Sequence, residues 1–183
     1  EEANALSGAD TVTFDPGVFS SPVTIPVSSE ISISDELILQ GPGMDILTIS
    51  GQDQTRILNI GYKNVEVYDM TFIHGSVPAY TLGGAIDTFA DSLLFDQCAF
   101  IANHSVNGGG AIHLTGDATL RACVFSENTS YSPLGLSSGG AIISESSHLI
   151  IENCSFENNV SKQSGSAIKC TSGLSVVFLN CDF

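Results

Sequence analysis

The chain has 183 residues and a formal net charge of −15, because 20 acidic residues outnumber five basic ones. This charge argues against binding to nucleic acid, anionic lipid or polyanionic sugars, whose charged groups would be repelled. About 43 % of the residues are apolar, but no apolar run approaches the roughly 18 residues that cross a membrane, so we expect no transmembrane segment. We expect no cofactor either, apart from weak Ca²⁺ binding by the acidic side chains.

Residues 1–10 are predicted to be the remnant of a cap. Glu1–Leu6 has the character of the end of a short amphipathic helix, and Gly8 would stop it. A helix in this place would cover the first turn of a repeat structure. An uncovered end would otherwise invite strand pairing.

Residues 11–64 contain short apolar segments separated by turns such as Asp15–Gly17 and Gly41–Gly43. Alternating apolar residues predict a strand in each segment. The predicted strands are Thr11–Phe14, Val23–Ile25, Ile31–Ile33, Leu37–Leu39, Ile46–Ile49 and Ile57–Ile60. Their spacing is irregular, which is typical of the terminal repeats of an array.

Residues 65–183 contain two alternating phrases. Gly-Gly-Ala-Ile begins at Gly83, Gly109 and Gly139, with the variant Gly-Ser-Ala-Ile at Gly165, so its spacings are 26, 30 and 26 residues. The second phrase is Phe-x-x-Asn. Its copies begin at Phe100, Phe125 and Phe156. A fixed pair of phrases at this period indicates a solenoid or a propeller.

An alignment of the copies on the phenylalanine decides between these two folds. Apolar residues recur seven, five and two positions before it, so each copy has two short strands with a two-residue period and a two-residue polar corner between them. Gly-Gly-Ala-Ile supplies a third strand. This pattern predicts an all-β, right-handed parallel β-helix of about six to seven turns, since a propeller blade needs four longer strands. The handedness follows the general rule for crossover connections.

The aligned inward residues are predicted to form ladders along the β-helix. An asparagine at the same corner of successive turns can bond amide to amide, and paired glycines suit a tight turn with positive φ. Stacked parallel thiols rarely reach the torsion of a disulfide, so we expect free cysteines. The predicted ladder residues are Phe72, Phe100, Phe125 and Phe156, then Asn103, Asn128 and Asn159, then Cys98, Cys123, Cys154 and Cys181.

These two phrases, over about Met70–Phe183, resemble the repeat of the chlamydial polymorphic membrane proteins, which are surface adhesins. The pattern departs at Gly75, where the repeat has asparagine, and at Ser166, where it has glycine. The segments Gly8–Gly17 and Leu39–Gly51 are similar to those of large secreted bacterial proteins with right-handed β-helix repeats. Both resemblances imply a right-handed β-helix and an extracellular or cell-surface location.

Asp96, Arg121 and Glu152 are the best catalytic candidates, because successive turns place them next to one another. Sugar lyases and hydrolases need clustered carboxylates, or carboxylate-bound Ca²⁺ with an Arg or Lys base. A cross-strand ion ladder explains the same residues without chemistry, and we favour it. Asp87 and His113 could form half of a catalytic relay. The next residue in their column is Ile143 rather than a nucleophile, so we interpret this column as a varied, solvent-facing one.

Two loops leave the asparagine corner with tyrosine, proline and aliphatic residues, namely Ser76–Leu82 and Ser130–Ser138. Binding residues concentrate on such loops, and tyrosine is favoured at interfaces. The alternative is that the two loops pack on each other. The predicted partner-binding residues are Val77, Tyr80, Tyr131, Leu134 and Leu136.

The sequence as a whole predicts one domain over residues 1–183. We expect a non-catalytic extracellular structural or adhesive protein with a surface protein or glycan partner. In a second form of this hypothesis, its open ends stack head to tail into filaments. Phe183 stands on the inward column without a polar cap, so we expect a longer array or a covering subunit. The alternative is a carbohydrate-active enzyme, a polysaccharide lyase or glycosidase.

Overall fold

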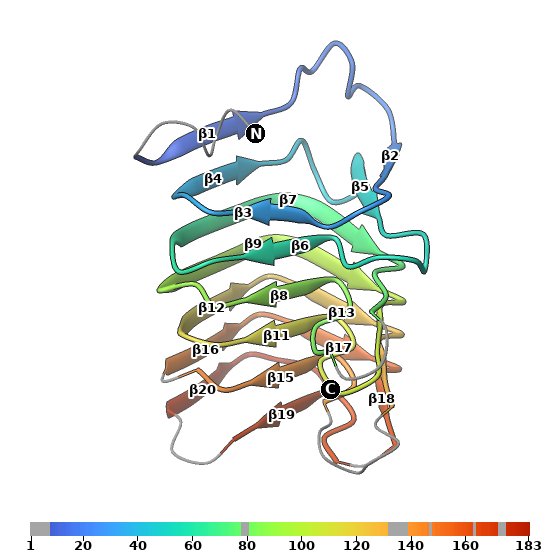
Figure 1. Ribbon diagram of the computed structural model, residues 1–183, viewed down its shortest axis with the longest axis vertical. Coiled ribbons are helices and arrows are strands. Elements are labelled where there is room, and N and C mark those ends of the chain that lie inside the picture. The colour runs from blue at the N-terminus through green and yellow to red at the C-terminus, as the bar shows by residue number, and fades with distance from the viewer. Residues whose placement is uncertain (1–7, 78–80, 132–138, 147, 163, 172–174) are drawn as a thin grey trace.

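The computed structural model describes residues 8–77, 81–131, 139–146, 148–162, 164–171 and 175–183. Short parallel strands wind into stacked turns along the long axis of the molecule (Figure 1). The strands line three lateral faces, and each strand pairs with the strand one turn away. The prediction of a parallel β-helix with three short strands per turn is therefore confirmed, with about six turns.

The first two faces belong to one sheet, because β7 and β9 run across the corner between them. The first face consists of β1 (Asp10–Thr13), β4 (Leu37–Gln40), the first halves of β7 (Asn64–Ile73) and β9 (Ser92–Ile101), β12 (Asp117–Arg121), β16 (His148–Glu152) and β20 (Ser175–Leu179). The second consists of β2 (Val23–Pro26), β5 (Leu47–Ser50), the second halves of β7 and β9, β13 (Val124–Ser126) and β17 (Ser155–Glu157).

The third face is a separate six-stranded sheet. It consists of β3 (Ile31–Ile33), β6 (Leu58–Ile60), β8 (Ile86–Thr88), β11 (Ile112–Leu114), β15 (Ile142–Ser144) and β19 (Ile168–Cys170). A short ladder follows the asparagine corner. Its strands are β10 (His104–Ser105), β14 (Thr129–Ser130) and β18 (Val160–Ser161).

The predicted helical cap is not supported. Residues 1–7 lie outside the described part of the chain, and Asp10 already begins strand β1. No helix occurs among the residues that the structure describes.

Stacked phenylalanines fill the interior. Phe100 and Phe125 have ring centroids 4.9 Å apart and planes 9° apart, and the same stacking joins Phe125 to Phe156 and Phe156 to Phe183. The rings of Phe72, Phe100 and Phe125 are fully buried. Strand register at about 4.8 Å per turn brings identical side chains into contact, so the repeat in the sequence becomes a continuous core.

The asparagine corner is a ladder of buried hydrogen bonds. Asn103 Nδ2 donates to Asn128 Oδ1 at 3.0 Å, and Asn128 Nδ2 donates to Asn159 Oδ1 at 2.9 Å. The same amides donate to main-chain oxygens of the neighbouring turn, including Phe100 O. Buried polar groups at this corner therefore find their partners in the next turn.

The corner between the first two faces is narrower than predicted. One residue per turn adopts a left-handed conformation there, whereas the sequence pattern predicts two polar corner residues. These single residues are Asp69, Gln97, Ala122, Asn153 and Asn180, with φ between 51° and 54°. The strands β7 and β9 continue through this corner as strands of ten residues, whereas the next two turns divide there into β12 and β13 and into β16 and β17.

The paired glycines have the two roles predicted for them. Gly109 has a φ of +60°, which favours glycine. A Cβ on Gly110 would collide with the carbonyl oxygens of Gly140 and Thr129. The described cysteines are free, and Cys98, Cys123 and Cys154 are buried. Burial raises the pKa of the Cys98 thiol to about 12, so this thiol behaves as a small apolar side chain.

Candidate functional site

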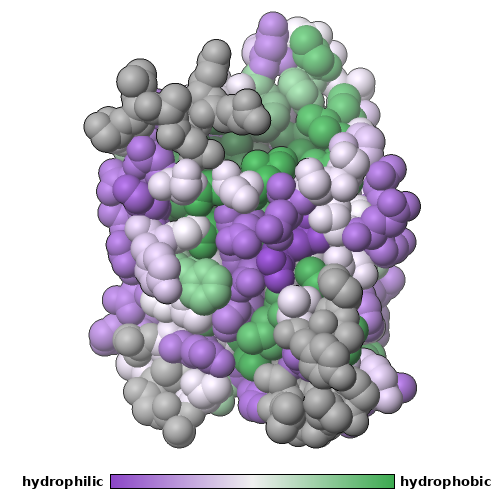
Figure 2. All heavy atoms as spheres, in the orientation of Figure 1, coloured by the Kyte–Doolittle hydropathy of each residue, from purple (hydrophilic) through white to green (hydrophobic). Residues whose placement is uncertain are grey.

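A chain of polar contacts runs along the outer side of the third face. Glu30 precedes β3, Arg56 precedes β6, Asp87 lies in β8 and His113 lies in β11. These residues are far apart in sequence, but stacking of the turns makes them neighbours. Figure 2 shows hydrophilic side chains gathered over β6 and β8, in the centre of this face.

Arg56 is the centre of this network. Its Nη1 lies 3.0 Å from Glu30 Oε2, and its Nη2 lies 3.3 Å from Asp87 Oδ2. Nε donates to Gly83 O at 3.0 Å and Nη2 donates to Leu82 O at 2.9 Å. The side chain is only 9 % exposed, and these partners compensate for the burial of its charge. Arg56 thereby holds the segment that enters β8 against the preceding turn.

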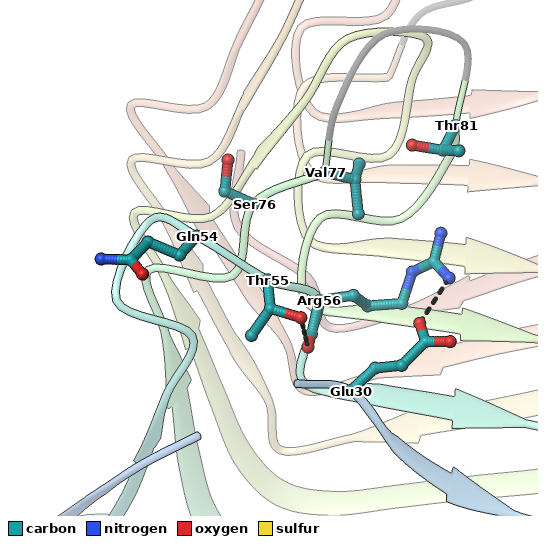
Figure 3. A pocket seen from close by; sticks show the side chains of 7 residues that line it. All are labelled: Glu30, Gln54, Thr55, Arg56, Ser76, Val77 and Thr81. Atoms are coloured by element: carbon teal, nitrogen blue, oxygen red, sulfur yellow. Dashed lines mark hydrogen bonds and ion pairs between the residues drawn. The ribbon is translucent and has the colours of Figure 1, made fainter. Parts of the chain in front are cut away.

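A cavity of about 210 Å³ opens beside the guanidinium group of Arg56. Figure 3 shows Glu30 and Arg56 side by side, with Val77 and Thr81 on the opposite wall and Gln54, Thr55 and Ser76 at the edge. Hydroxyl, amide, carboxylate and guanidinium groups from three turns thus line one cavity. Val77 alone among these seven lining residues has a purely apolar side chain.

His113 extends the network beyond Asp87. Its Nδ1 lies 2.7 Å from Asp87 Oδ1, while its buried Nε2 has no hydrogen-bond partner among the described residues. The predicted solvent-facing position is wrong, because His113 is buried and so is Ile143 in the same column. The ring of Phe89, from the turn after β8, packs edge-on against His113, and exposed Tyr62 packs on Phe89.

The structure brings the three predicted catalytic candidates together on the first face. Arg121 Nη2 donates a short hydrogen bond to Asp96 Oδ2, and Glu152 faces Arg121 in the paired strand. The hydrogen bond that Arg121 donates to Asp96, with a smaller contribution from the charge of Glu152, raises the pKa of Arg121. A general base needs a pKa lowered towards the operating pH. The contacts of Arg121 raise its pKa instead, so they do not prepare this residue to act as a base.

The predicted partner-binding residues are only partly described. Val77 is buried and lines the cavity beside Arg56. Tyr131 is 43 % exposed, and Lys162 Nζ lies 4.2 Å from the centroid of its ring. Tyr80, Leu134 and Leu136 lie outside the described residues.

Sequence reasoning missed Glu30 and Arg56. Both stand in the irregular N-terminal turns, where no repeat column aligns them with other residues. The sequence did hold an indication of this site. Arg56 is one of only five basic residues, and it directly precedes Ile57, whose side chain is fully buried.

The described residues include no group of three or more His, Cys, Asp or Glu side chains that could hold a metal ion. Weak Ca²⁺ binding stays a proposal, and Asp96, its best carboxylate candidate, already pairs with Arg121. No helix in the described part of the chain is long and apolar enough to cross a membrane.

A comparison with protein families matches residues 62–183 to the model described as right handed beta helix region. This match covers the regular repeats and two thirds of the chain. Comparisons with curated proteins and with solved structures found no match.

Proposed function

Because the chain belongs to the right-handed β-helix family, we propose that it is a non-catalytic structural or adhesive protein whose lateral faces bind a partner at a cell surface. The family includes enzymes as well as structural proteins, so the fold alone does not decide between them. The location is part of the proposal. The charge of −15 and the resemblance to the polymorphic membrane protein repeat support it.

The ion pair of Arg121 with Asp96 carries this proposal. In a sugar lyase, Arg121 would have to accept a proton, and Asp96 would have to bind substrate or Ca²⁺. The ion pair occupies both side chains with each other. The guanidinium of Arg121 is protonated at ordinary pH and holds Asp96 as its partner. A ladder of paired charges fits a stabilised surface better than a reaction centre.

We test the proposal by measuring binding and cleavage in parallel. The protein is passed over immobilised glycans and extracellular-matrix proteins, and is incubated with soluble polysaccharides that are assayed for new reducing ends and for unsaturated uronides. We expect saturable binding to at least one immobilised ligand and no cleavage.

Two outcomes contradict the proposal. Cleavage that is lost in the double variant Asp96→Ala, Glu152→Ala would establish the alternative, a carbohydrate-active enzyme. Absence of both binding and cleavage would remove the adhesive function.

Self-association is the second part of the proposal. The last described turn exposes Phe183 and Phe178, whose equivalents in earlier turns, such as Phe156 and Ile151, are buried. At the other end, a cavity of about 310 Å³ is lined mainly by apolar side chains, including Phe14 and Ile25. We propose that a second copy supplies the next parallel turn, so that copies stack head to tail.

A further inference from the structure

We propose that the cavity beside Arg56 binds one neutral sugar residue of a glycan, with Glu30 and Arg56 as its principal hydrogen-bonding groups. This inference rests on the proposed adhesive function and names the partner class for one face. It is carried by the composition, size and charge of the cavity and by the aromatic surface that continues from it.

The size of the cavity limits the ligand to a single small ring. Its volume of about 210 Å³ is below the range of about 300–1,000 Å³ for pockets that hold drug-sized ligands. The cavity is open to solvent rather than enclosed, so a longer chain can continue out of it.

The lining favours a ligand rich in hydroxyl groups. Glu30 and Arg56 present an acceptor and a donor 3.0 Å apart, close to the separation of two neighbouring sugar hydroxyls. The Glu30 side chain is 40 % exposed, so its carboxylate remains accessible. Hydrogen bonds among the described residues use three of the five N–H groups of Arg56, and Nη2 also pairs with Asp87. Nη1 thus has a second N–H that can donate to a ligand.

The remaining lining completes a sugar site. Gln54, Thr55 and Ser76 add donors and acceptors at the edge. Val77 supplies an apolar wall for the C–H face of a sugar ring. A purely apolar ligand would leave the buried polar groups without their water, which costs free energy.

The local charge selects a neutral ligand. Glu30 and Asp87 provide two carboxylates, and Arg56 provides one guanidinium, so anionic sugars would be repelled. A cationic ligand would find Glu30 already paired with Arg56. A neutral sugar is not repelled by the carboxylates and does not compete with Arg56 for the charge of Glu30. Its hydroxyl groups can form hydrogen bonds with both Glu30 and Arg56.

The same face offers a stacking surface for the next sugar residues. Arg56 contacts Asp87, Asp87 contacts His113, and Phe89 packs on the buried ring of His113, so a chain of contacts on the third face links the cavity to the aromatic pair. Tyr62 is 71 % exposed beside Phe89. An aromatic ring of this exposure can cover the apolar face of a sugar.

The experiment uses the whole chain and ligand-observed NMR with titration calorimetry. The probes are neutral methyl hexosides and methyl N-acetylhexosaminides, their di- and trisaccharides, and galacturonic and sialic acids. We expect a neutral monosaccharide to bind, the oligosaccharide that contains it to bind more tightly, and the acids not to bind.

Three variants locate the site. Glu30→Gln keeps the shape and removes the charge, and it should weaken monosaccharide binding at least tenfold. Gln54→Ala, at an exposed position, should weaken it severalfold without disturbing the fold. Tyr62→Ala should remove the gain of the oligosaccharide and leave the monosaccharide affinity unchanged. The control is Glu36→Gln, which changes a carboxylate outside the cavity. Glu36 accepts from Asn64 of the next turn, as Glu30 accepts from Asn59, and the variant should bind as the wild type does.

The inference is overturned if no neutral sugar binds, if only acidic sugars bind, or if Glu30→Gln and Gln54→Ala both bind with wild-type affinity. These failures differ from a failure of the proposed function. If immobilised ligands still capture Glu30→Gln fully, adhesion stands and this site is wrong. If no immobilised ligand captures the wild type while a soluble sugar binds in the cavity, the site stands and the adhesive function is wrong.

Discussion

Tyr68 lies at the corner of the first face, and the ionisation of its phenol affects the stability of the fold. Its hydroxyl donates to Glu66 Oε2 at 2.6 Å. This hydrogen bond, with burial as a smaller cause, raises the pKa of Tyr68 to about 12 from its usual 10.0. The neighbouring carboxylate thus stabilises the neutral phenol in the folded state.

We expect this shift to appear as a loss of stability in alkali. Between pH 10 and 12 the unfolded chain releases the phenolic proton while the folded chain still holds it. Deprotonation therefore favours the unfolded state, and the contribution of Tyr68, complete below pH 10, disappears as the pH rises through this window. Urea unfolding below and within the window should show a smaller alkaline loss in Tyr68→Phe than in the wild type.

The matched control for this prediction is Tyr62→Phe, which removes an exposed phenol from the same protein. An equal alkaline loss in the wild type and in Tyr68→Phe would show that the Glu66 hydrogen bond does not persist in solution.

At the scale of structural elements, the asparagine ladder predicts which position of the corner matters most for folding. Asn128 donates to Phe100 O and Asn159 Oδ1, and its own Oδ1 accepts from the main chain and the side chain of Asn103. Asn128→Ala leaves several of these buried groups without partners, at about 1–3 kcal/mol each. We expect a loss of about 3 kcal/mol or more in the free energy of unfolding, measured by urea titration.

The control for the ladder is Asn64→Ala, because Asn64 makes a comparable amide contact with Glu36 on the exposed surface. Its cost should stay within about 0.5 kcal/mol. Equal costs at the two positions would mean that the ladder adds nothing to an ordinary surface contact.

The strands of the β-helix could be predicted from the sequence because each face is set by a local two-residue period. Phe72, Phe100 and Phe125 align in the structure as they do in the repeat. The number of residues at the corner between the first two faces was predicted less well, because two were expected and one turns the chain. Asp69, Asn153 and Asn180 are of the residue types that favour positive φ, whereas Gln97 and Ala122 adopt it without that preference. Residue type therefore marks this corner only in part.

The third face could not be predicted in the same way, because its contacts join irregular turns. Arg56 bonds to Glu30 and Asp87 across two turn boundaries, and neither partner shares a motif with it. The burial of His113 depends on Phe89, which reaches it from the turn after β8. Such coverage by a neighbouring turn leaves no periodic signal in the sequence.

At the scale of the whole molecule, the proposed head-to-tail stacking makes a prediction about Phe183. This ring is 71 % exposed and continues the aromatic stack beyond Phe156. Phe183→Asp would place a charge in that stack, so we expect it to convert oligomers or filaments into the 19.1 kDa monomer. Light scattering after size-exclusion chromatography, with negative-stain microscopy of the same peak, measures this.

Ile150→Asp is the matched control, since Ile150 is an exposed apolar residue on a lateral face and its variant should assemble as the wild type does. A wild type that remains monomeric at every concentration would exclude stacking through the ends.

The direction of the strands also determines how the molecule would respond to a pull. In Figure 1 the strands lie across the long axis, so the hydrogen bonds between turns point along it. A force between the two ends would open these bonds in sequence, as a zipper opens, rather than shear many at once. Each turn of 25–31 residues would then add about 80–110 Å of extended chain. Such a rod would yield stepwise under load and act as an extensible tether rather than a stiff one.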